Sequence, residues 1–175
     1  MELKKRFRLT LADYTAFNFF HLKGRLIALP IIFIVLMPVA IMLIDLANYG
    51  YVDPMILIAA LVVAVVLGAV VTLINIVSVR YSAKKQYKSS KAMQSENDIT
   101  IDQSGVHETG EYGNTVSGWF DMIKATESPS SYNIYFSRLQ AFVIPKRILT
   151  PDEEEILRTL VYQHLPPEKV KLRRK

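Results

Sequence analysis

One short stretch of the chain carries side chains that could bind a metal ion. His107, Glu108 and Glu111 lie within five residues of one another, and imidazole and carboxylate groups are common metal ligands. Neighbouring residues of a β-strand point to opposite faces, so His107 and Glu108 of the strand expected here would not share one ion. We therefore predict no metal site.

Two further groups of residues could bind a ligand. Trp119 lies two residues before Asp121, a pair that is more typical of a buried aromatic residue beside a turn cap than of a binding site. Lys146 and Arg147 follow a predicted strand, and Arg138 lies in the hairpin before it. These cations could contact phosphate groups, but they are more typical of solvated charge at a strand end.

The chain shows no pattern of residues that is typical of catalysis. The acidic run 152–155 stands at the expected start of a helix, where negative charge is favourable against the helix dipole, and it does not form an acid–base pair. The sequence has no cysteine, no phosphate-cradling glycine loop and no serine-elbow motif. We predict that the protein is not an enzyme and holds no cofactor.

Two long apolar runs determine where any such residues would work. Leu26–Ile44 and Met55–Ile74 contain 19 and 20 residues, and neither contains a charged residue. A helix of about 20 residues matches the hydrocarbon thickness of a bilayer. A chain of 175 residues has too little else to cover two such runs as core helices. We predict two transmembrane helices, at 26–44 and 55–78.

The charges around these runs predict their orientation. All 21 lysine and arginine residues lie outside the link 45–54, which holds two aspartates. Basic segments stay on the cytoplasmic side, so we expect both termini inside, in the inner (plasma) membrane of a bacterial cell. This placement explains the net charge of +5 without nucleic acid. Four basic residues after the second run are candidates for contact with membrane lipid or a partner: Arg80, Lys84, Lys85 and Lys88.

Small residues recur every fourth position in the second run, at Ala60, Ala64, Gly68 and Thr72. Such a ladder allows close helix packing, with the first helix of the same hairpin or, as the alternative, in a homodimer. Pro30 and Pro38 predict a kink in the first helix without requiring a break. The absence of ionisable residues within both runs argues against a channel or pump made by this chain alone.

The remaining segments predict a small α+β domain. Alternating residues at 5–9 indicate a strand, and Thr10 with Asp13 indicates the start of a helix over 11–22. Short strands separated by turn residues follow from 96 onward. Thr150, Pro151 and Glu153 then predict a capped helix that ends near Leu165. The predicted parts are 1–25 (strand and juxtamembrane helix), 26–44, an external link at 45–54, 55–78, a basic helix at 79–94, a cytosolic domain at 95–165 and a basic tail at 166–175. We expect residues 169–175 of this tail to be disordered.

The cytosolic part resembles a known family. The segments that carry the resemblance are Ile99-Thr100-Ile101, Gly105-Val106, 117–123, Tyr132, Tyr135 and 141–147, together with Asp13-Tyr14 and Phe17-Asn18. They resemble the YcxB-like bacterial membrane proteins, which implies two membrane helices, pleckstrin-homology-like strands in an antiparallel sheet and a closing helix. The resemblance implies no catalytic residue.

Two hypotheses of function remain open at this point. In the first, the protein is a membrane-tethered adaptor or regulator whose cytosolic domain binds another protein or a membrane component. In the second, it is an accessory subunit of a transport or peptide-immunity system and acts through its membrane hairpin. The second hypothesis predicts that changes at Pro30, Pro38 or the Ala64–Gly68 face abolish function, whereas the first predicts that the cytosolic domain is essential.

Overall fold

The computed structural model describes residues 1–173, which form two separate units. The hairpin unit comprises His21–Ser82. The second unit, called the α+β unit below, comprises Met1–Phe20 together with the chain from Ala83 onward. Two mainly antiparallel sheets and a later helix, together with the two long apolar helices, confirm the predicted α+β class.

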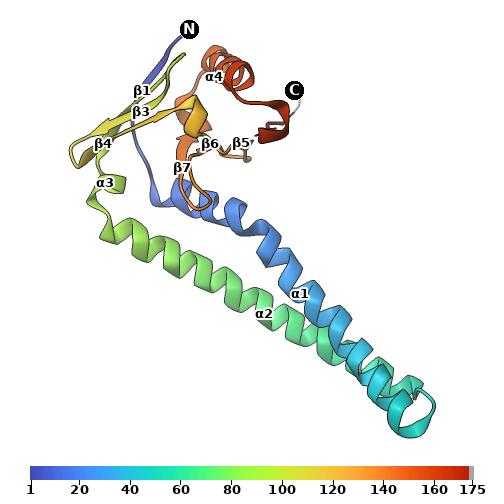
Figure 1. The fold of residues 1–175 in the computed structure, drawn as a ribbon. Helices are drawn as coiled ribbons and strands as arrows, with labels where there is room; N and C mark the ends of the chain where they lie inside the picture. Colours follow the sequence, from blue (N-terminus) through green and yellow to red (C-terminus); the bar gives the residue numbers. More distant parts are fainter. Residues whose placement is uncertain (174–175) are drawn as a thin grey trace. The chain divides into compact units, whose positions relative to one another are not determined.

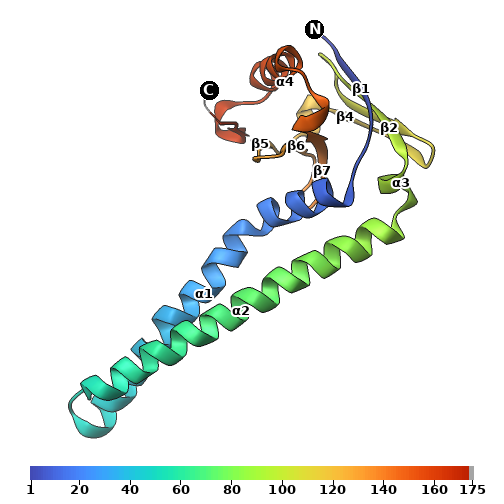
Figure 2. The same ribbon diagram turned by 180° about the vertical axis from the view of Figure 1, so that it is seen from behind.

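Two helices, α1 (Leu11–Tyr49) and α2 (Pro54–Ser89), account for the whole hairpin unit apart from its turn (Figure 2). Both are long and apolar enough to cross a membrane. The helix expected at 11–22 and the first apolar run form one continuous helix, and Pro30 and Pro38 lie inside it. A proline removes one backbone donor, and membrane helices tolerate this loss.

The link between the two helices is shorter than the 45–54 expected. Asp45–Tyr49 continue α1, because Leu46 and Ala47 favour helix. The helix ends at Tyr49, before Gly50, whose φ of 73° is left-handed and whose N–H donates to the carbonyl of Leu46 at 3.1 Å. Asp45 is therefore a helical residue, and only 6% of it is exposed.

Small residues of α2 face α1 within the hairpin unit. Ala60 and Ala64 are buried, and Gly68 is buried one turn further on. A Cβ atom placed on Gly68 would lie 3.4 Å from Ile34 Cγ1 and 3.5 Å from the carbonyl oxygen of Pro30. The small side chains thus allow the two helices to approach closely.

The first sheet of the α+β unit has the strand order β1-β2-β3-β4. Its strands are β1 (Leu3–Arg8), β2 (Glu96–Ile101), β3 (Gly105–Gly110) and β4 (Gly113–Gly118), all antiparallel. Leu3 pairs with Ile101 and Arg8 with Glu96, so both long helices are inserted in the connection between two neighbouring strands. Figure 1 shows β1 beside the other strands of this sheet, although α1 and α2 separate it from β2 in sequence.

The second sheet has the order β7-β6-β5-β8. Its antiparallel strands are β5 (Lys124–Glu127), β6 (Ser131–Tyr135) and β7 (Ala141–Pro145). The short β8 (Val170–Lys171) pairs parallel with β5. The sequence predicts disorder for 169–175; this prediction is wrong for 169–171, which form the end of a 3-10 turn (Pro167–Lys169) and β8. Residues 174–175 of that tail lie outside the described residues.

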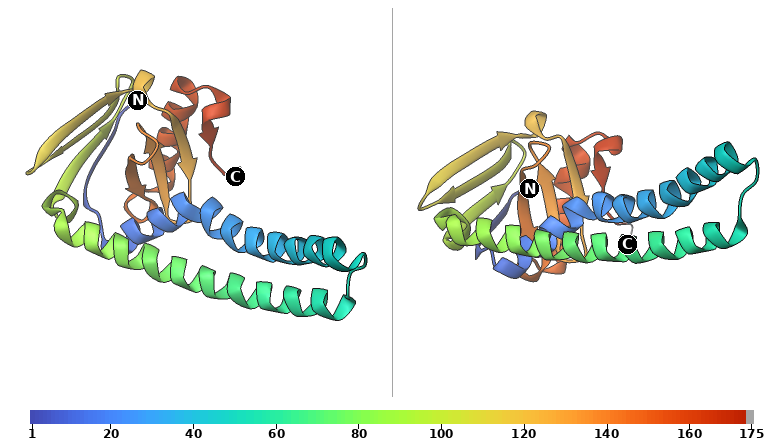
Figure 3. Two further views of the ribbon diagram at one scale, coloured as in Figure 1. Left: turned by 60° about the horizontal axis from the view of Figure 1, so that its bottom comes forward. Right: turned by 90° about the horizontal axis from the view of Figure 1, so that it is seen from below.

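Helix α4 (Pro151–His164) covers the second sheet (Figure 3). Its predicted capping box is confirmed: Glu153 N donates to Thr150 Oγ1 at 3.3 Å, and Thr150 N donates to Glu153 Oε2 at 2.8 Å. Leu157, Leu160 and Val161 of α4 are buried in one core with residues of both sheets. Two antiparallel sheets followed by a closing helix are consistent with a pleckstrin-homology-like arrangement.

The basic helix expected at 79–94 is divided. Residues up to Ser89 belong to α2, and a short helix α3 (Lys91–Gln94) follows. Ser90 separates them because its extended backbone starts a new helix, which its hydroxyl caps by accepting from Met93 N.

Candidate binding groove

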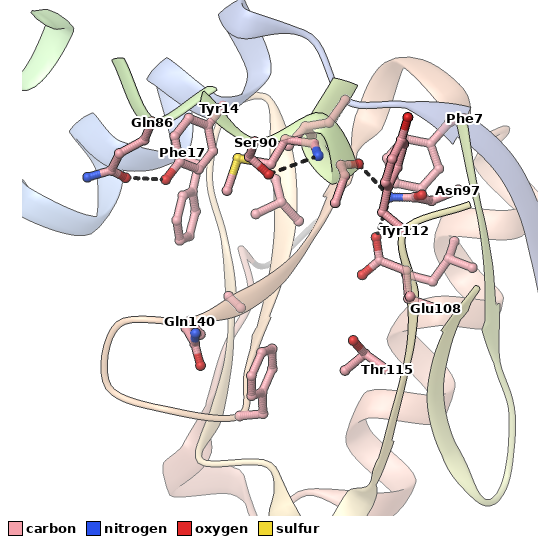
Figure 4. Close-up of a pocket in the computed structure, with 18 of the residues that line it drawn as sticks. Phe7, Tyr14, Phe17, Gln86, Ser90, Asn97, Glu108, Tyr112, Thr115 and Gln140 are labelled. Atoms are coloured by element: carbon pink, nitrogen blue, oxygen red, sulfur yellow. Dashed lines mark hydrogen bonds between the residues drawn. The ribbon is translucent and has the colours of Figure 1, made fainter. Parts of the chain in front are cut away.

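A groove of about 660 Å³ opens on one side of the α+β unit (Figure 4). Every residue that lines it belongs to this unit. The lining comes from β1 to β4 on one side, from β7 and the loop before it on the other, and from the start of α1, the end of α2 and α3. This volume lies within the range of small-molecule sites.

Glu108 of β3 supplies the carboxylate of the groove. Asn97 Nδ2 donates a hydrogen bond of 2.9 Å to Glu108 Oε1 (Figure 4). Burial raises the pKa of this carboxyl above its usual range, although the bond from Asn97 acts in the opposite direction. An empty groove therefore disfavours the charged form of Glu108.

The strand register explains how Asn97 reaches Glu108. Asn97 pairs with Gly110 across β2 and β3, and Ile99 pairs with Glu108. A Cβ atom on Gly110 would lie 2.1 Å from Asn97 Oδ1, so only glycine leaves room for the amide. Gly110 thus allows the Asn97 side chain to lie over β3 and to bind the carboxylate on the same face.

The ends of both long helices also contribute to the groove. Tyr14 at the start of α1 donates a hydrogen bond of 2.6 Å to Gln86 Oε1 near the end of α2 (Figure 4). Phe17, which is 5% exposed, lies with its ring centre 6.1 Å from that of Tyr135. Tyr14, Phe17 and Gln86 all line the groove. A bound molecule would therefore contact residues of α1 and α2 directly.

An ion pair holds the first turn of α1 against the same unit. Arg147 Nη2 donates to Asp13 Oδ2 at 2.7 Å and to the carbonyl of Arg8 at 2.9 Å. Burial opposes ionisation of Asp13, but the hydrogen bonds from Arg147 and Thr10 outweigh it and hold its pKa below the usual range. Arg147 is exposed, as the sequence predicts, and is also paired with Asp13, which the sequence does not predict.

Lys146 is also paired, in a buried cluster around Glu127. The carboxylate of Glu127 accepts hydrogen bonds from Lys146 Nζ, from Arg158 Nη2 at 2.5 Å and from Arg173 N at 2.8 Å. Burial raises the pKa of Tyr132 to about 12, and its hydroxyl donates to Glu154 Oε2 at 2.9 Å. This cluster joins the end of the described chain to β5 and α4.

The other side chains considered in the sequence lie apart from the groove. His107 points away from Glu108 and its Nε2 lies 2.8 Å from Ser104 Oγ, and Glu111 is exposed. Among the described residues no three histidine or acidic side chains could hold a metal ion together. Trp119 is buried, donates to the carbonyl of Asp102 at 2.8 Å and stacks on His164.

The residues selected from sequence occupy two other places. Arg80, Lys84, Lys85 and Lys88 are all exposed on α2. Ala60, Ala64 and Gly68 lie against α1 inside the hairpin unit. Neither set lines the groove. Contact of the basic residues with lipid or a partner stays a prediction.

Sequence reasoning missed the groove, although one signal pointed to it. Glu108 lies on the strand face opposite His107, and that strand has Val106 buried on the same face. An acid on an inward-facing position is uncommon and is a reason to look for a ligand or partner group. The remaining lining residues come from segments as far apart as Phe7 and Val143, and no spacing in the sequence joins them.

Comparison with known families confirms the resemblance over part of the chain. Residues 101–161 match the family described as YcxB-like protein. This range runs from the end of β2 into α4, so the chain contains a YcxB-like domain. No curated protein and no solved structure shows significant similarity to the chain.

Proposed function

We propose that this protein is a membrane-tethered adaptor or regulator, whose YcxB-like domain recognises another protein or a membrane component and catalyses no reaction. The observation that carries this proposal is the groove, which is open, is lined by both polar and apolar side chains, and includes Tyr14, Phe17 and Gln86 from the ends of α1 and α2. Recognition in the α+β unit would thereby reach both apolar helices.

The hairpin supplies the tether in this proposal. Both helices span the inner membrane of a bacterial cell, with the two termini in the cytoplasm, since lysine and arginine flank the apolar runs and are absent from the link. Tethering raises the effective concentration of the domain at the membrane surface. The exposed cations Arg80, Lys84, Lys85 and Lys88 contact anionic lipid, at about 1 kcal/mol for each charge close to the surface.

The bond between Tyr14 and Gln86 would couple the groove to the ends of α1 and α2 that lie in the α+β unit. This bond joins residues that are 72 positions apart and that belong to different helices. A partner could bind more tightly when the two helix ends are held together than when they are apart. Binding would then shift the protein toward the first state, by an amount set by the difference between the two affinities. Couplings of this kind are typically about 1–3 kcal/mol.

Site-specific photo-cross-linking in native membranes tests the proposal. A benzophenone side chain replaces Thr115 at the rim of the groove and, as the matched control, Glu155 on the exposed face of α4. We expect a discrete adduct with another protein or with a lipid from position 115 and none from position 155. Adducts with this chain alone, or the same adducts from both positions, would count against recognition in the groove.

One observation favours the second function, an accessory subunit of a transport or peptide-immunity system. Asp45 is 6% exposed within α1, and its Oδ2 has no hydrogen-bond partner among the described residues. A buried ionisable group in a membrane helix often marks a functional site. This function predicts that Asp45→Asn abolishes activity while groove variants are neutral. Homodimerisation through Ala60, Ala64 and Gly68 has less support, because α1 already covers that face.

A further inference from the structure

We propose that the groove binds a small organic cation with an apolar body, such as an aromatic or aliphatic amine, and that Glu108 is its counter-ion. The inference goes beyond the proposed function, since it assigns a soluble ligand to the groove in addition to the protein or membrane component proposed above. Three features of the groove carry it: its charge, the way in which its carboxylate is held, and its apolar lining.

The charge of the groove is opposite to that of the chain. The protein has 21 lysine and arginine residues and a net charge of +5, yet none of the described residues that line the groove is basic. Glu108 is the acidic residue of this lining, and its other ionisable side chains are the phenols of Tyr14 and Tyr112. The groove therefore attracts a cation and offers no charged donor to a phosphate or a carboxylate.

The carboxylate is held in place before any ligand binds. Asn97 donates to one oxygen of Glu108, and Gly110 leaves the space that Asn97 needs. Burial makes the charged form of Glu108 unfavourable in the empty groove. A cation beside the carboxylate offsets this effect, since an opposite charge within about 4–6 Å favours ionisation.

The rest of the lining suits the apolar body of such a ligand. Aromatic side chains come from three separate elements or loops, at Phe7, Phe17 and Phe136. Aromatic faces attract ammonium groups and also bury aliphatic or aromatic carbon. Leu9, Met93 and Leu139 add aliphatic surface. A purely apolar ligand would supply no charge to balance the carboxylate of Glu108, to which Asn97 donates a hydrogen bond, and an anion would be repelled by the charged form.

The test uses the full-length protein in nanodiscs of phosphatidylglycerol, which carry no lipid amine. The probe is benzyltrimethylammonium, and the matched ligands are benzyl alcohol, which is neutral, and benzoate, which is anionic. Binding is followed by saturation-transfer NMR and calorimetry at neutral pH. Glu108→Gln is compared with Glu111→Gln, which changes an exposed acid three residues away.

We expect the cation to bind with a dissociation constant of about 1 mM or below, as is usual for a ligand of this size. Glu108→Gln should weaken this binding about tenfold, since it removes the attraction between two opposite charges, and Glu111→Gln should leave it unchanged. Equal binding of benzyl alcohol, equal binding to Glu108→Gln, or no binding of the cation would overturn the inference. Displacement of the probe by added phosphatidylethanolamine would overturn the assignment to a soluble amine and assign the groove to a lipid headgroup.

Failure of this inference is distinguishable from failure of the proposed function. Photo-cross-linking from position 115 detects any partner in the groove, whatever its charge. An adduct at this position without cation binding would support the adaptor function and would show that the ligand is not an organic cation.

Discussion

Tyr14 donates its phenolic hydrogen to Gln86 Oε1 at 2.6 Å, and this bond joins the start of α1 to the end of α2 within the α+β unit. Tyr87 adds a second connection nearby, from its hydroxyl to the carbonyl of Leu9 at 2.9 Å. The ends of the two apolar helices are thus held by the same unit that contains the groove. Within the α+β unit, these two bonds join the start of α1 and the residues before it to the end of α2.

Tyr14→Phe tests this connection. The variant removes one hydrogen bond and keeps the ring, so the free energy of unfolding should fall by about 1 kcal/mol. Amide hydrogen exchange should also become faster in residues 83–89, where α2 loses its contact with α1. Tyr162→Phe on the exposed face of α4 is the control. Unchanged exchange in 83–89 would show that the bond does not hold the helix ends together.

The raised pKa of Glu108 predicts a pH dependence of stability. Between the usual glutamate pKa and the raised value, the folded protein binds more protons than the unfolded chain, so stability falls as pH rises through this window. Glu108→Gln should remove this part of the slope, and Glu111→Gln should keep it. Thermal unfolding of the three proteins between pH 4 and pH 7 measures the effect. A slope shared by all three proteins would contradict the burial argument.

The contribution of Glu127 to stability should depend on pH in the opposite direction. Burial opposes its ionisation, but the bonds from Lys146, Arg173 and Arg158 outweigh burial and hold its pKa below the usual range. Its contribution to stability is therefore present above the usual glutamate pKa and is lost as pH falls through the lowered value.

Glu127→Gln should be strongly destabilising. Its side chain is 3% exposed, and the variant leaves Lys146 and Arg158 without their carboxylate, at a cost of about 3 kcal/mol in the free energy of unfolding. Denaturant unfolding at pH 7 measures the loss, with the exposed Glu155→Gln as the control. Similar stability of the two variants would show that the cluster contributes little.

Position 68 tests the packing of the hairpin. Gly68→Ala should be tolerated, since its Cβ would meet Ile34 at 3.4 Å, an ordinary contact. Gly68→Leu has no space and should separate the helices. Hydrogen exchange around Pro30 in nanodiscs measures the opening, with Val66→Leu, which changes an exposed residue of α2, as the control. Equal exchange in Gly68→Leu and Val66→Leu would contradict the packing.

Local patterns predicted the elements of this fold better than their assembly. Charge-free runs of helical length predicted α1 and α2, and the pair Thr150 and Glu153 predicted the start of α4. These features depend on neighbouring residues alone. The pairing of β1 with β2 depends on residues some 90 positions apart, which no local pattern contains.

The groove could not be predicted for the same reason. Its acid and its apolar lining meet only when both sheets and three helices assemble. The ion pairs of Lys146 with Glu127 and of Arg147 with Asp13 cannot be predicted either, because the partners lie far apart in sequence. The sequence predicts Asp45 in a link because a charged residue usually ends an apolar run. In the structure α1 continues beyond Asp45, because the residues that follow it favour helix.

We propose that the hairpin holds the YcxB-like domain on the cytoplasmic side of a membrane. The sequence has no cysteine, so single cysteines at Tyr51 in the turn and at Glu155 on α4, both exposed, can be labelled without background. A membrane-impermeant maleimide should label Tyr51→Cys in intact cells and Glu155→Cys only after the membrane is opened. Labelling of Glu155→Cys in intact cells, or of Tyr51→Cys only after opening, would contradict the account.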